Sequence, residues 1–314
     1  MPHFADNPFF RTRNDVQAIN ALAEKEPDTL IARSDLRLQK HIESAARQIA
    51  ARGARLVLLS GPSGSGKTTA ARFLAEALTK LSHPAKNLST DDFYLGAARA
   101  PRRPNGEPDL ECPEAMDLPA LQACVRGLAL NGACETPVFD FSAQRPSGEH
   151  REIRLGKDGV AVLEGIHALN PLLTQDVPDL QNVVRVFLSV QQEVRIGPQV
   201  LLSPPQVRLI RRIVRDFRFR STSPAQTLHM WPAVMEGERK YITPWKAGAD
   251  LTLNSLLPYE FGVLRGCAVP LLRRVEDDTP EGKTAQDLAF ALALFHAIPL
   301  DKVPAQSLLR EFIG

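Results

Sequence analysis

The segment that most constrains the fold is the glycine-rich stretch "GPSGSGKT", Gly61 to Thr68, which separates two apolar runs. The preceding "RLVLLS" is short and nearly all apolar, as expected for a strand buried on both faces of a parallel sheet. The following "TTAARFLAEALTKL" repeats apolar residues at helical spacing. A strand, a glycine-rich loop and a helix in this order predict an anion-binding loop at the start of the helix.

The same stretch fits the pattern G-x-x-x-x-G-K-[ST], which holds the phosphates of a nucleoside triphosphate. Glycines let successive backbone N–H groups turn toward phosphate oxygens, and the positive end of the helix dipole faces the same anion. The ammonium of Lys67 would approach the outer phosphates, and the Thr68 hydroxyl would be a ligand for Mg²⁺. A chance match is expected in about one sequence in a hundred of this length. The predicted nucleotide-binding residues are Gly61, Ser63, Gly64, Ser65, Gly66, Lys67, Thr68 and Thr69.

Strand-like segments recur along the chain and are separated by helical patterns, which predicts an α/β fold. We expect a doubly wound, mostly parallel sheet of the P-loop NTPase class with a helical lid. A hairpin, "REIRLGKDG", is expected just before the third strand. A helix is expected from Ser34 to Gly53, with residues 1–33 running over the surface. The expected strands are 55–60, Lys86–Thr90, Gly159–Gly165, Asn182–Val190 and Ala249–Asn254.

The composition is that of an ordinary globular protein, with 44% apolar and 24% charged residues. A net charge of +2 disfavours a general nucleic-acid binder. Runs of about 18 apolar residues, which a membrane span needs, are missing from the sequence. The N-terminus lacks the pattern of a secretory signal, and the four cysteines form no C-x-x-C pair. We therefore expect a cytoplasmic protein; a homo-oligomer is compatible with the sequence.

A carboxylate at the end of the third strand completes the predicted metal site. Glu164 in "VAVLEGIH" would hold Mg²⁺ or its waters opposite Thr68. The alternative is a strand-terminal acid that faces solvent. The N-K-x-D string of guanine-specific proteins is missing, which favours ATP.

Two further segments distinguish a kinase from other nucleotide-binding proteins. Asp91 and Asp92 in "LSTDDFY" follow the second strand, where an acid would accept the proton of an attacking hydroxyl; either acid would alternatively cap the next helix. The segment "VRLIRRIVRDFRFR" repeats arginines at three- and four-residue spacing, including Arg208, Arg211 and Arg215. Such a face would neutralise a transferring phosphoryl group, or would be a solvated basic helix or a nucleic-acid patch.

With these segments in order, the chain resembles the phosphoribulokinase/uridine kinase family of P-loop kinases, and within it the nucleoside kinases. The matching segments cover roughly residues 55–260 and are "GPSGSGKTT", "LSTDDFY", "ECPEAMDL", "PVFDFSAQR", "VLEGIH", "RLIRRIVRD" and "ADLTLN". The resemblance implies residues 54–314 as a kinase domain, with a lid around 204–240, preceded by a helical extension over 1–53.

The resemblance also implies individual roles. Asp91 matches the acid that activates a sugar 5′-hydroxyl, and Tyr94 an aromatic residue of the nucleoside pocket. Glu111 takes the place of an aspartate that binds ribose hydroxyls. Phe139 and Gln144 align with residues that stack on and read the pyrimidine, and Gln144 replaces a common histidine, as Cys112 does in "LECPE". Arg208, Arg211 and Arg215 lie in the lid segment, where Arg211 and Arg215 would act in catalysis and Arg208 would bind ATP.

These residues predict in-line transfer of the ATP γ-phosphoryl group to a primary hydroxyl of a uridine- or cytidine-like nucleoside. One alternative acceptor is another small polyol or acid, such as a sugar phosphate, glycerate or pantothenate. The other alternative is a nucleotide-dependent regulatory or RNA-associated ATPase whose arginine helix binds a partner.

Overall fold

The computed structural model describes residues 14–140 and 143–314, which form two compact units. The first unit combines the described residues up to Leu38 with Val190–Trp231 and Asn254–Gly314. The second unit comprises Gln39–Ser189 and Pro232–Leu253. The described residues up to Leu38 share the first unit with much of the predicted lid segment and with the C-terminal helices, and the division into domains after residue 53 stays a prediction.

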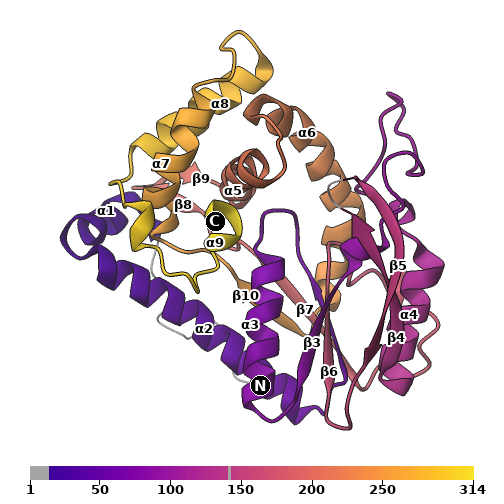
Figure 1. Ribbon diagram of the computed structural model, residues 1–314. Coiled ribbons are helices and arrows are strands. Elements are labelled where there is room, and N and C mark those ends of the chain that lie inside the picture. Colours follow the sequence, from indigo (N-terminus) through magenta and orange to yellow (C-terminus); the bar gives the residue numbers. More distant parts are fainter. Residues whose placement is uncertain (1–13, 141–142) are drawn as a thin grey trace. The chain divides into compact units, whose positions relative to one another are not determined.

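The second unit is built on a five-stranded sheet of order β10-β7-β2-β6-β3 (Figure 1). Strand β2 pairs in parallel with both β6 and β7, and β3 pairs in parallel with β6. Every residue of β2 and β6 is buried, which explains their continuous apolar sequences. All five strands predicted from the sequence are therefore confirmed. Their bounds are Leu56–Ser60 (β2), Ala85–Ser89 (β3), Val160–Glu164 (β6), Val183–Ser189 (β7) and Leu251–Asn254 (β10).

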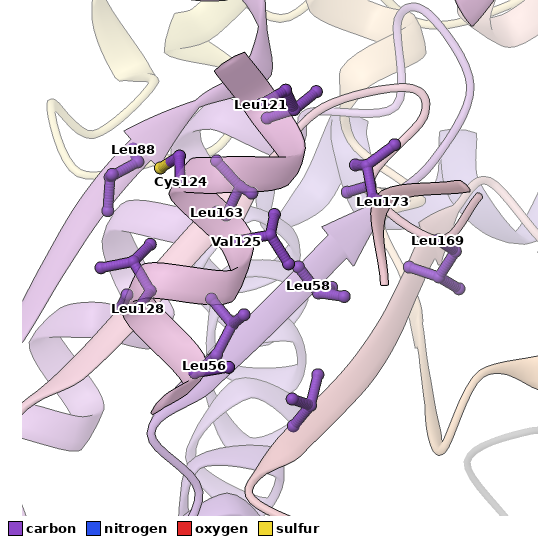
Figure 2. Close-up of a cluster of buried hydrophobic side chains, with 14 of the residues drawn as sticks. Leu56, Leu58, Leu88, Leu121, Cys124, Val125, Leu128, Leu163, Leu169 and Leu173 are labelled. Carbon is purple, nitrogen blue, oxygen red and sulfur yellow. The ribbon is translucent and has the colours of Figure 1, made fainter. Parts of the chain in front are cut away.

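Two helices of this unit are positioned by the sheet. Helix α3, Lys67–Lys80, contacts β2, β3 and β6. Helix α4, Leu118–Asn131, presents its apolar stripe to one face of the sheet, where Leu121, Val125 and Leu128 pack with leucines of β2 and β6 (Figure 2). Caps define α4, since the Asp117 carboxylate accepts a hydrogen bond from the Ala120 N–H and Gly132 ends the helix at φ 67°.

The hairpin prediction is wrong in its pairing. The residues "REIR" belong to β5, Arg145–Arg154, but β5 pairs antiparallel with the preceding β4, Ala133–Asp140. The residues "GKDG" form the turn between β5 and β6 instead. Pro137 and Pro146 obscured the alternating pattern of these strands, and a two-stranded ribbon can accommodate proline because it has free edges. Short turns complete the unit: η3 (Thr90–Phe93), η4 (Pro113–Ala115), η5 (Pro171–Leu173), η6 (Glu238–Ile242) and η7 (Thr243–Gly248).

The described part of the N-terminal region is helical, in contrast to the prediction for residues 1–33. Helix α1 covers Val16–Lys25 and is capped by the Asp15 carboxylate, while α2 covers Pro27–Ala51. Pro27 starts α2 because the first helical position needs no N–H donor. Ser34 is therefore inside the helix, where its hydroxyl donates to the Leu30 carbonyl at 2.7 Å. The prediction for residues 1–13 lies outside the described residues.

The first unit contains a small sheet of order β1-β8-β9, in which β1 and β8 are parallel and β8 and β9 are antiparallel. Helix α5, the arginine-rich segment, packs against α7 and α9. Helix α6 begins in this unit and ends in the other. The bounds are Asn14–Asp15 (β1), Val194–Ile196 (β8), Gln199–Leu202 (β9), Pro204–Phe219 (α5), Pro224–Gly237 (α6), Glu260–Leu272 (α7), Pro280–Ala293 (α8), Leu300–Lys302 (η8) and Arg310–Ile313 (α9). In the described part of the chain, every helix is too short or too polar to cross a membrane.

Candidate active site

The glycine-rich loop connects β2 to α3, as predicted, and its glycines are sterically required. Gly64 and Gly66 have φ angles of 75° and 90°, in the left-handed region that other residues avoid. A Cβ on Gly61 would lie 2.0 Å from the carbonyl oxygen of Leu188 in β7. The predicted loop residues, Gly61 and 63–69, lie before and in the first turn of α3, where the positive end of the helix dipole favours an anion.

Polar groups of the loop support a fit to phosphate. The Ser65 hydroxyl is buried and has no hydrogen-bond partner within residues 14–140 and 143–314, although its own N–H donates to the Pro62 carbonyl. The Lys67 ammonium reaches back over the loop to the same carbonyl at 3.4 Å. A triphosphate would supply the acceptor that Ser65 lacks.

Oxygen donors converge at the carboxyl ends of neighbouring strands. The Thr68 hydroxyl donates to Glu164 Oε1 at 3.0 Å, and the Ser89 hydroxyl donates to the same oxygen at 3.1 Å. Glu164 ends β6 and is buried, so its carboxylate faces protein groups and not bulk water. These hard oxygen ligands fit Mg²⁺. Ser89 was missed by the sequence analysis, although its position at the end of β3, two residues before Asp91, was a signal.

The two acids after β3 are distinguished by their contacts. Ser89, and not Asp91 or Asp92, caps the turn η3, since its hydroxyl accepts from the Asp91 N–H at 3.2 Å. The Asp92 carboxylate joins the hairpin, because it accepts from the Arg151 guanidinium at 2.8 Å and from the Phe139 N–H at 3.4 Å. Asp92 therefore has a positioning role, and Asp91 is the acid whose backbone is bonded to the Ser89–Glu164 group.

The residues predicted to bind the acceptor come from separate segments that meet in the second unit. The rings of Tyr94 and Phe139 pack edge to face, with centroids 6.5 Å apart. The Tyr94 hydroxyl donates to the carbonyl of Leu110, the residue before Glu111, at 3.1 Å. A Cβ on Gly237 would lie 2.4 Å from the Glu111 Cβ, so the end of α6 lies against Glu111. The backbone carbonyl of Gln144 lies beside Gly96, two residues after Tyr94.

Cys112, which departs from the family pattern, is part of an apolar cluster. It packs with Ala100 and Ala115, and Tyr94 and Tyr241 pack against the same cluster. Burial, with smaller contributions from Asp109 and Glu114, raises the pKa of the Cys112 thiol to about 11. The thiol therefore stays protonated near neutral pH and contributes apolar surface, not a nucleophile.

A cavity of about 370 Å³ opens beside the Thr68–Glu164 contact. It lies between α3, β3 and the hairpin, and its lining includes Ser89 and Asp92. Two arginines, Arg72 and Arg151, also line it, and they form ion pairs with Glu76 and Asp92. The predicted acceptor residues Tyr94, Glu111, Phe139 and Gln144 are not part of this lining.

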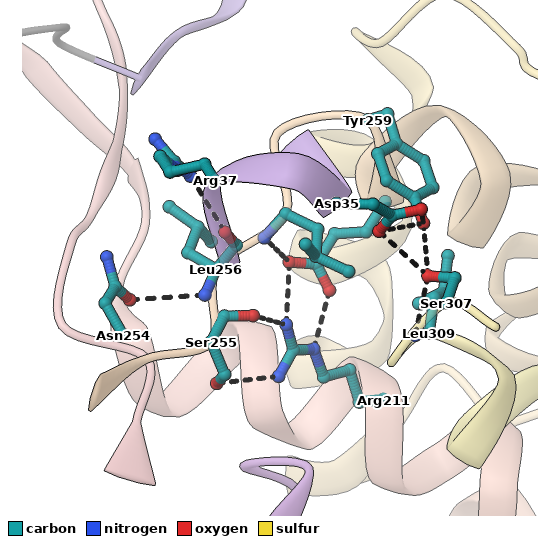
Figure 3. A network of polar contacts seen from close by, with 11 residues as sticks. Asp35, Arg37, Arg211, Asn254, Ser255, Leu256, Tyr259, Ser307 and Leu309 are labelled. Atoms are coloured by element: carbon teal, nitrogen blue, oxygen red, sulfur yellow. Dashed lines mark hydrogen bonds and ion pairs between the residues drawn. The ribbon is translucent and has the colours of Figure 1, made fainter. Parts of the chain in front are cut away.

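The arginines of the predicted basic face on α5, in the first unit, differ in their burial and in their bonding partners. Arg211 is fully buried, and its guanidinium donates to both carboxylate oxygens of Glu260 at 2.6 and 2.9 Å and to the Ser255 carbonyl at 2.8 Å (Figure 3). Its guanidinium also lies 5.2 Å from the centre of the Phe312 ring. These contacts give Arg211 a structural role in holding α5 to α7, so we do not retain the prediction that Arg211 is catalytic.

The other arginines of α5 are also partnered. Arg212 and Arg215 form ion pairs with Asp216 at 3.1 and 2.7 Å, and Arg208 is buried over the Trp231 ring at 5.5 Å. Asp216 thus offsets part of the charge that suggested a basic face. It was visible in the sequence as the acid in "IVRDFR".

The chain is similar to several known proteins. Residues 56–259 match the model of the phosphoribulokinase / uridine kinase family. A uridine kinase of Lactobacillus helveticus is 25% identical over 197 residues, which cover 62% of this chain and 84% of that protein. A uridine kinase of Schizosaccharomyces pombe is 29% identical over 195 residues, covering 62% of this chain and 37% of that protein. A solved structure described as a possible uridine kinase from Bacillus stearothermophilus is 17% identical, with a TM-score of 0.46, and covers 69% of this chain and 100% of that one.

Proposed function

The chain belongs to the phosphoribulokinase/uridine kinase family and is an ATP-dependent phosphotransferase, and we propose that its acceptor is the 5′-hydroxyl of a uridine- or cytidine-like nucleoside. One observation carries this proposal. The Ser89 hydroxyl bonds both the Glu164 carboxylate, at 3.1 Å, and the Asp91 N–H, at 3.2 Å. Ser89 thereby connects the backbone of the candidate base, Asp91, with the candidate metal ligand Glu164 at the carboxyl ends of the strands.

The proposed reaction is a direct in-line transfer. The acceptor oxygen forms a bond to the γ-phosphorus while the bond between that phosphorus and the ADP oxygen breaks. Asp91 orients the hydroxyl and accepts its proton, which later passes to solvent. Lys67 and the N–H groups at the start of α3 stabilise the charge on the phosphates. Mg²⁺, held by Thr68 and Glu164, would neutralise charge on the β- and γ-phosphate oxygens.

The acceptor would be bound by the residues that surround Tyr94. The rings of Tyr94 and Phe139 offer an apolar wall for a pyrimidine, and Glu111 would accept hydrogen bonds from ribose hydroxyls. The Gln144 amide offers both a donor and an acceptor to a pyrimidine edge. For ATP, the resemblance supports Arg208 and Arg215 as phosphate ligands, and this part of the proposal rests on the resemblance alone.

A second acceptor class is favoured by the 370 Å³ cavity. A sugar phosphate or an organic acid would need a cationic pocket, and Arg72 and Arg151 supply guanidinium groups beside the candidate metal ligands. Both guanidiniums are already paired with acids, however, which reduces the net positive charge available to a ligand. We therefore rank this class second.

The test is ADP release measured with nucleosides, sugars and organic acids as acceptors, with mass detection of the product. The proposal expects uridine or cytidine to give a 5′-monophosphate at the highest kcat/KM. Product from a sugar acid or phosphate, but not from a nucleoside, would overturn it. In that case Arg151→Gln should abolish most of the activity, whereas Arg154→Gln, a neighbouring exposed arginine outside the cavity lining, should not.

A further inference from the structure

His167 is a buried histidine that the proposed reaction does not yet use. It lies three residues beyond Glu164 and is 0% exposed. Neither ring nitrogen has a hydrogen-bond partner in the part of the chain that the structure describes. Burying a polar group without a partner costs free energy, so such a group needs a physical explanation. A ligand that supplies the missing partner is one.

The surroundings of the ring connect it with the candidate active site. The Tyr241 ring packs edge to face against it, with centroids 6.2 Å apart. Burial, together with the charge of Lys67, lowers the pKa of His167 to about 4. The Glu111 and Tyr241 carbonyls and the charge of Asp109 act in the opposite direction. These carbonyls approach the ring without reaching hydrogen-bonding geometry. The imidazole is therefore neutral at physiological pH.

Each of these neighbours belongs to a functional segment of the second unit. Lys67 is the lysine of the phosphate loop, and Glu111 is the residue assigned to ribose. Tyr241 packs on the same apolar cluster as Tyr94, the aromatic residue assigned to the nucleoside. His167 is thus near both the phosphate-binding segment and the acceptor-binding segment.

We propose that His167 binds a hydroxyl group of the acceptor, next to the hydroxyl bound by Glu111, and so selects for ribose-like polyols. This inference rests on the proposed function. A neutral imidazole offers one N–H donor and one acceptor nitrogen, and an alcohol has the complementary acceptor and donor. An anionic acceptor group would gain less binding free energy from His167 than an alcohol would, because a neutral ring has no charge to pair with the anion.

The first experiment compares the wild type with His167→Leu on uridine, 2′-deoxyuridine and 3′-deoxyuridine. A site that hydrogen-bonds a substrate hydroxyl discriminates strongly against analogues that lack it. We expect His167→Leu to lower kcat/KM for uridine by about 10-fold or more, with an unchanged KM for ATP. For the analogue that lacks the contacted hydroxyl, the kcat/KM values of the variant and the wild type should agree within about threefold. Equal losses on all three nucleosides would overturn the proposal.

Glu111→Gln is the matched comparison, because the proposed function assigns Glu111 to a ribose hydroxyl as well. The two variants should lose discrimination at different ribose hydroxyls, and loss at one and the same hydroxyl would contradict the inference. Loss of discrimination in Glu111→Gln alone would leave His167 outside the binding site and would contradict the inference.

The second measurement does not depend on the nucleoside. Without ligand, His167→Leu should raise Tm by a few degrees, since an unpaired buried imidazole is replaced by an apolar side chain of similar size. A fall in Tm would mean that the ring has a structural partner, and would contradict the inference.

If the wild type phosphorylates no nucleoside, the proposed function fails. The wild type and His167→Leu are then compared on the polyol that is the substrate and on its deoxy analogue. Equal losses of kcat/KM on both compounds would overturn the inference about His167.

Discussion

Two polar regions of this protein differ in how completely their groups are bonded. In the first unit, Arg211 and Glu260 are both fully buried, and they bond to each other and to Ser255. Asp35, Tyr259 and Ser307 form a second bonded group in the same unit (Figure 3). In the second unit, by contrast, the Ser65 hydroxyl and both His167 nitrogens are buried without a partner in residues 14–140 and 143–314.

The difference agrees with the roles proposed above: the bonded groups of the first unit hold the fold, and ligands would complete the bonds of Ser65 and His167. A buried ion pair tolerates its loss of hydration when every donor finds an acceptor, and such a pair gives no reason to invoke a ligand. An unbonded buried hydroxyl or imidazole is costly in the free protein, and it becomes favourable when a bound molecule completes its bonds. This criterion gives Arg211 a structural role, although its position in the sequence suggested catalysis.

Replacing Arg211 should cause the largest loss of stability. Arg211→Ala leaves the Glu260 carboxylate buried and without its ion-pair partner, which should lower the free energy of unfolding by about 3–5 kcal/mol. Arg220→Ala is the control, since Arg220 is exposed and 3.7 Å from Asp216, and should cost less than about 0.5 kcal/mol. Denaturant unfolding measures both. An Arg211→Ala protein of normal stability that had lost turnover would restore Arg211 to a catalytic role.

Replacing Asp91 should affect turnover and not folding. Asp91→Asn removes the proposed base, so kcat should fall by at least about 10²-fold while ATP affinity is retained. Nucleotide titration and steady-state kinetics measure the two effects. Asp92→Asn weakens the contact with Arg151 and should lower kcat by less than about 10-fold. A larger effect at Asp92 than at Asp91 would reverse the assignment of the two acids.

Replacing Glu164 should change the metal requirement. Glu164→Gln removes the charge from the oxygen that Thr68 and Ser89 share, so the Mg²⁺ concentration for half-maximal activity should rise by about 10–100-fold. ADP release measured across a Mg²⁺ series tests this, with Ser89→Ala expected to give a smaller shift. An unchanged Mg²⁺ dependence in Glu164→Gln would exclude this carboxylate from the metal site.

The smallest expected effect concerns Asp250, a surface acid just before β10. Burial alone would raise its pKa, but hydrogen bonds and charge from Arg185 and Arg52 lower it below the ordinary value of 3.8. A carboxyl with a lowered folded-state pKa stabilises the protein above that ordinary value, and the contribution disappears as the pH falls through the folded-state pKa. Asp250→Asn should therefore cost about 1 kcal/mol at pH 7, and the difference from wild type should shrink below pH 3.8. A constant difference across this pH range would contradict the ion-pair explanation.

Local sequence patterns predicted the strands of the sheet and the glycine-rich loop of the second unit. Three strands of the sheet, β2, β6 and β7, are short buried apolar runs bounded by polar or glycine-rich turns. Strands β3 and β10 are less buried and were identified from the turns that bound them. The glycine-rich loop between β2 and α3 was predicted because its glycines, lysine and threonine have fixed spacing. The hairpin β4–β5 was missed because each strand contains a proline and β5 is largely exposed, so the apolar alternation is weak. Helix α1 and the first turns of α2 were missed because Ser34 resembles an N-cap residue, whereas α2 begins at Pro27.

The sequence by itself determined the glycine-rich loop, the positions of the five strands along the chain and the acids at their ends or just after them, because these depend on residues close together in the chain. The tertiary structure alone decided which of two adjacent acids binds the hairpin, which arginine of one helix is buried against Glu260, and that His167 has no partner. Each of these depends on contacts between residues far apart in the sequence. Helical spacing places side chains on a face of α5, but the residues packed against that face decide whether a charge is paired, solvated or available to a ligand.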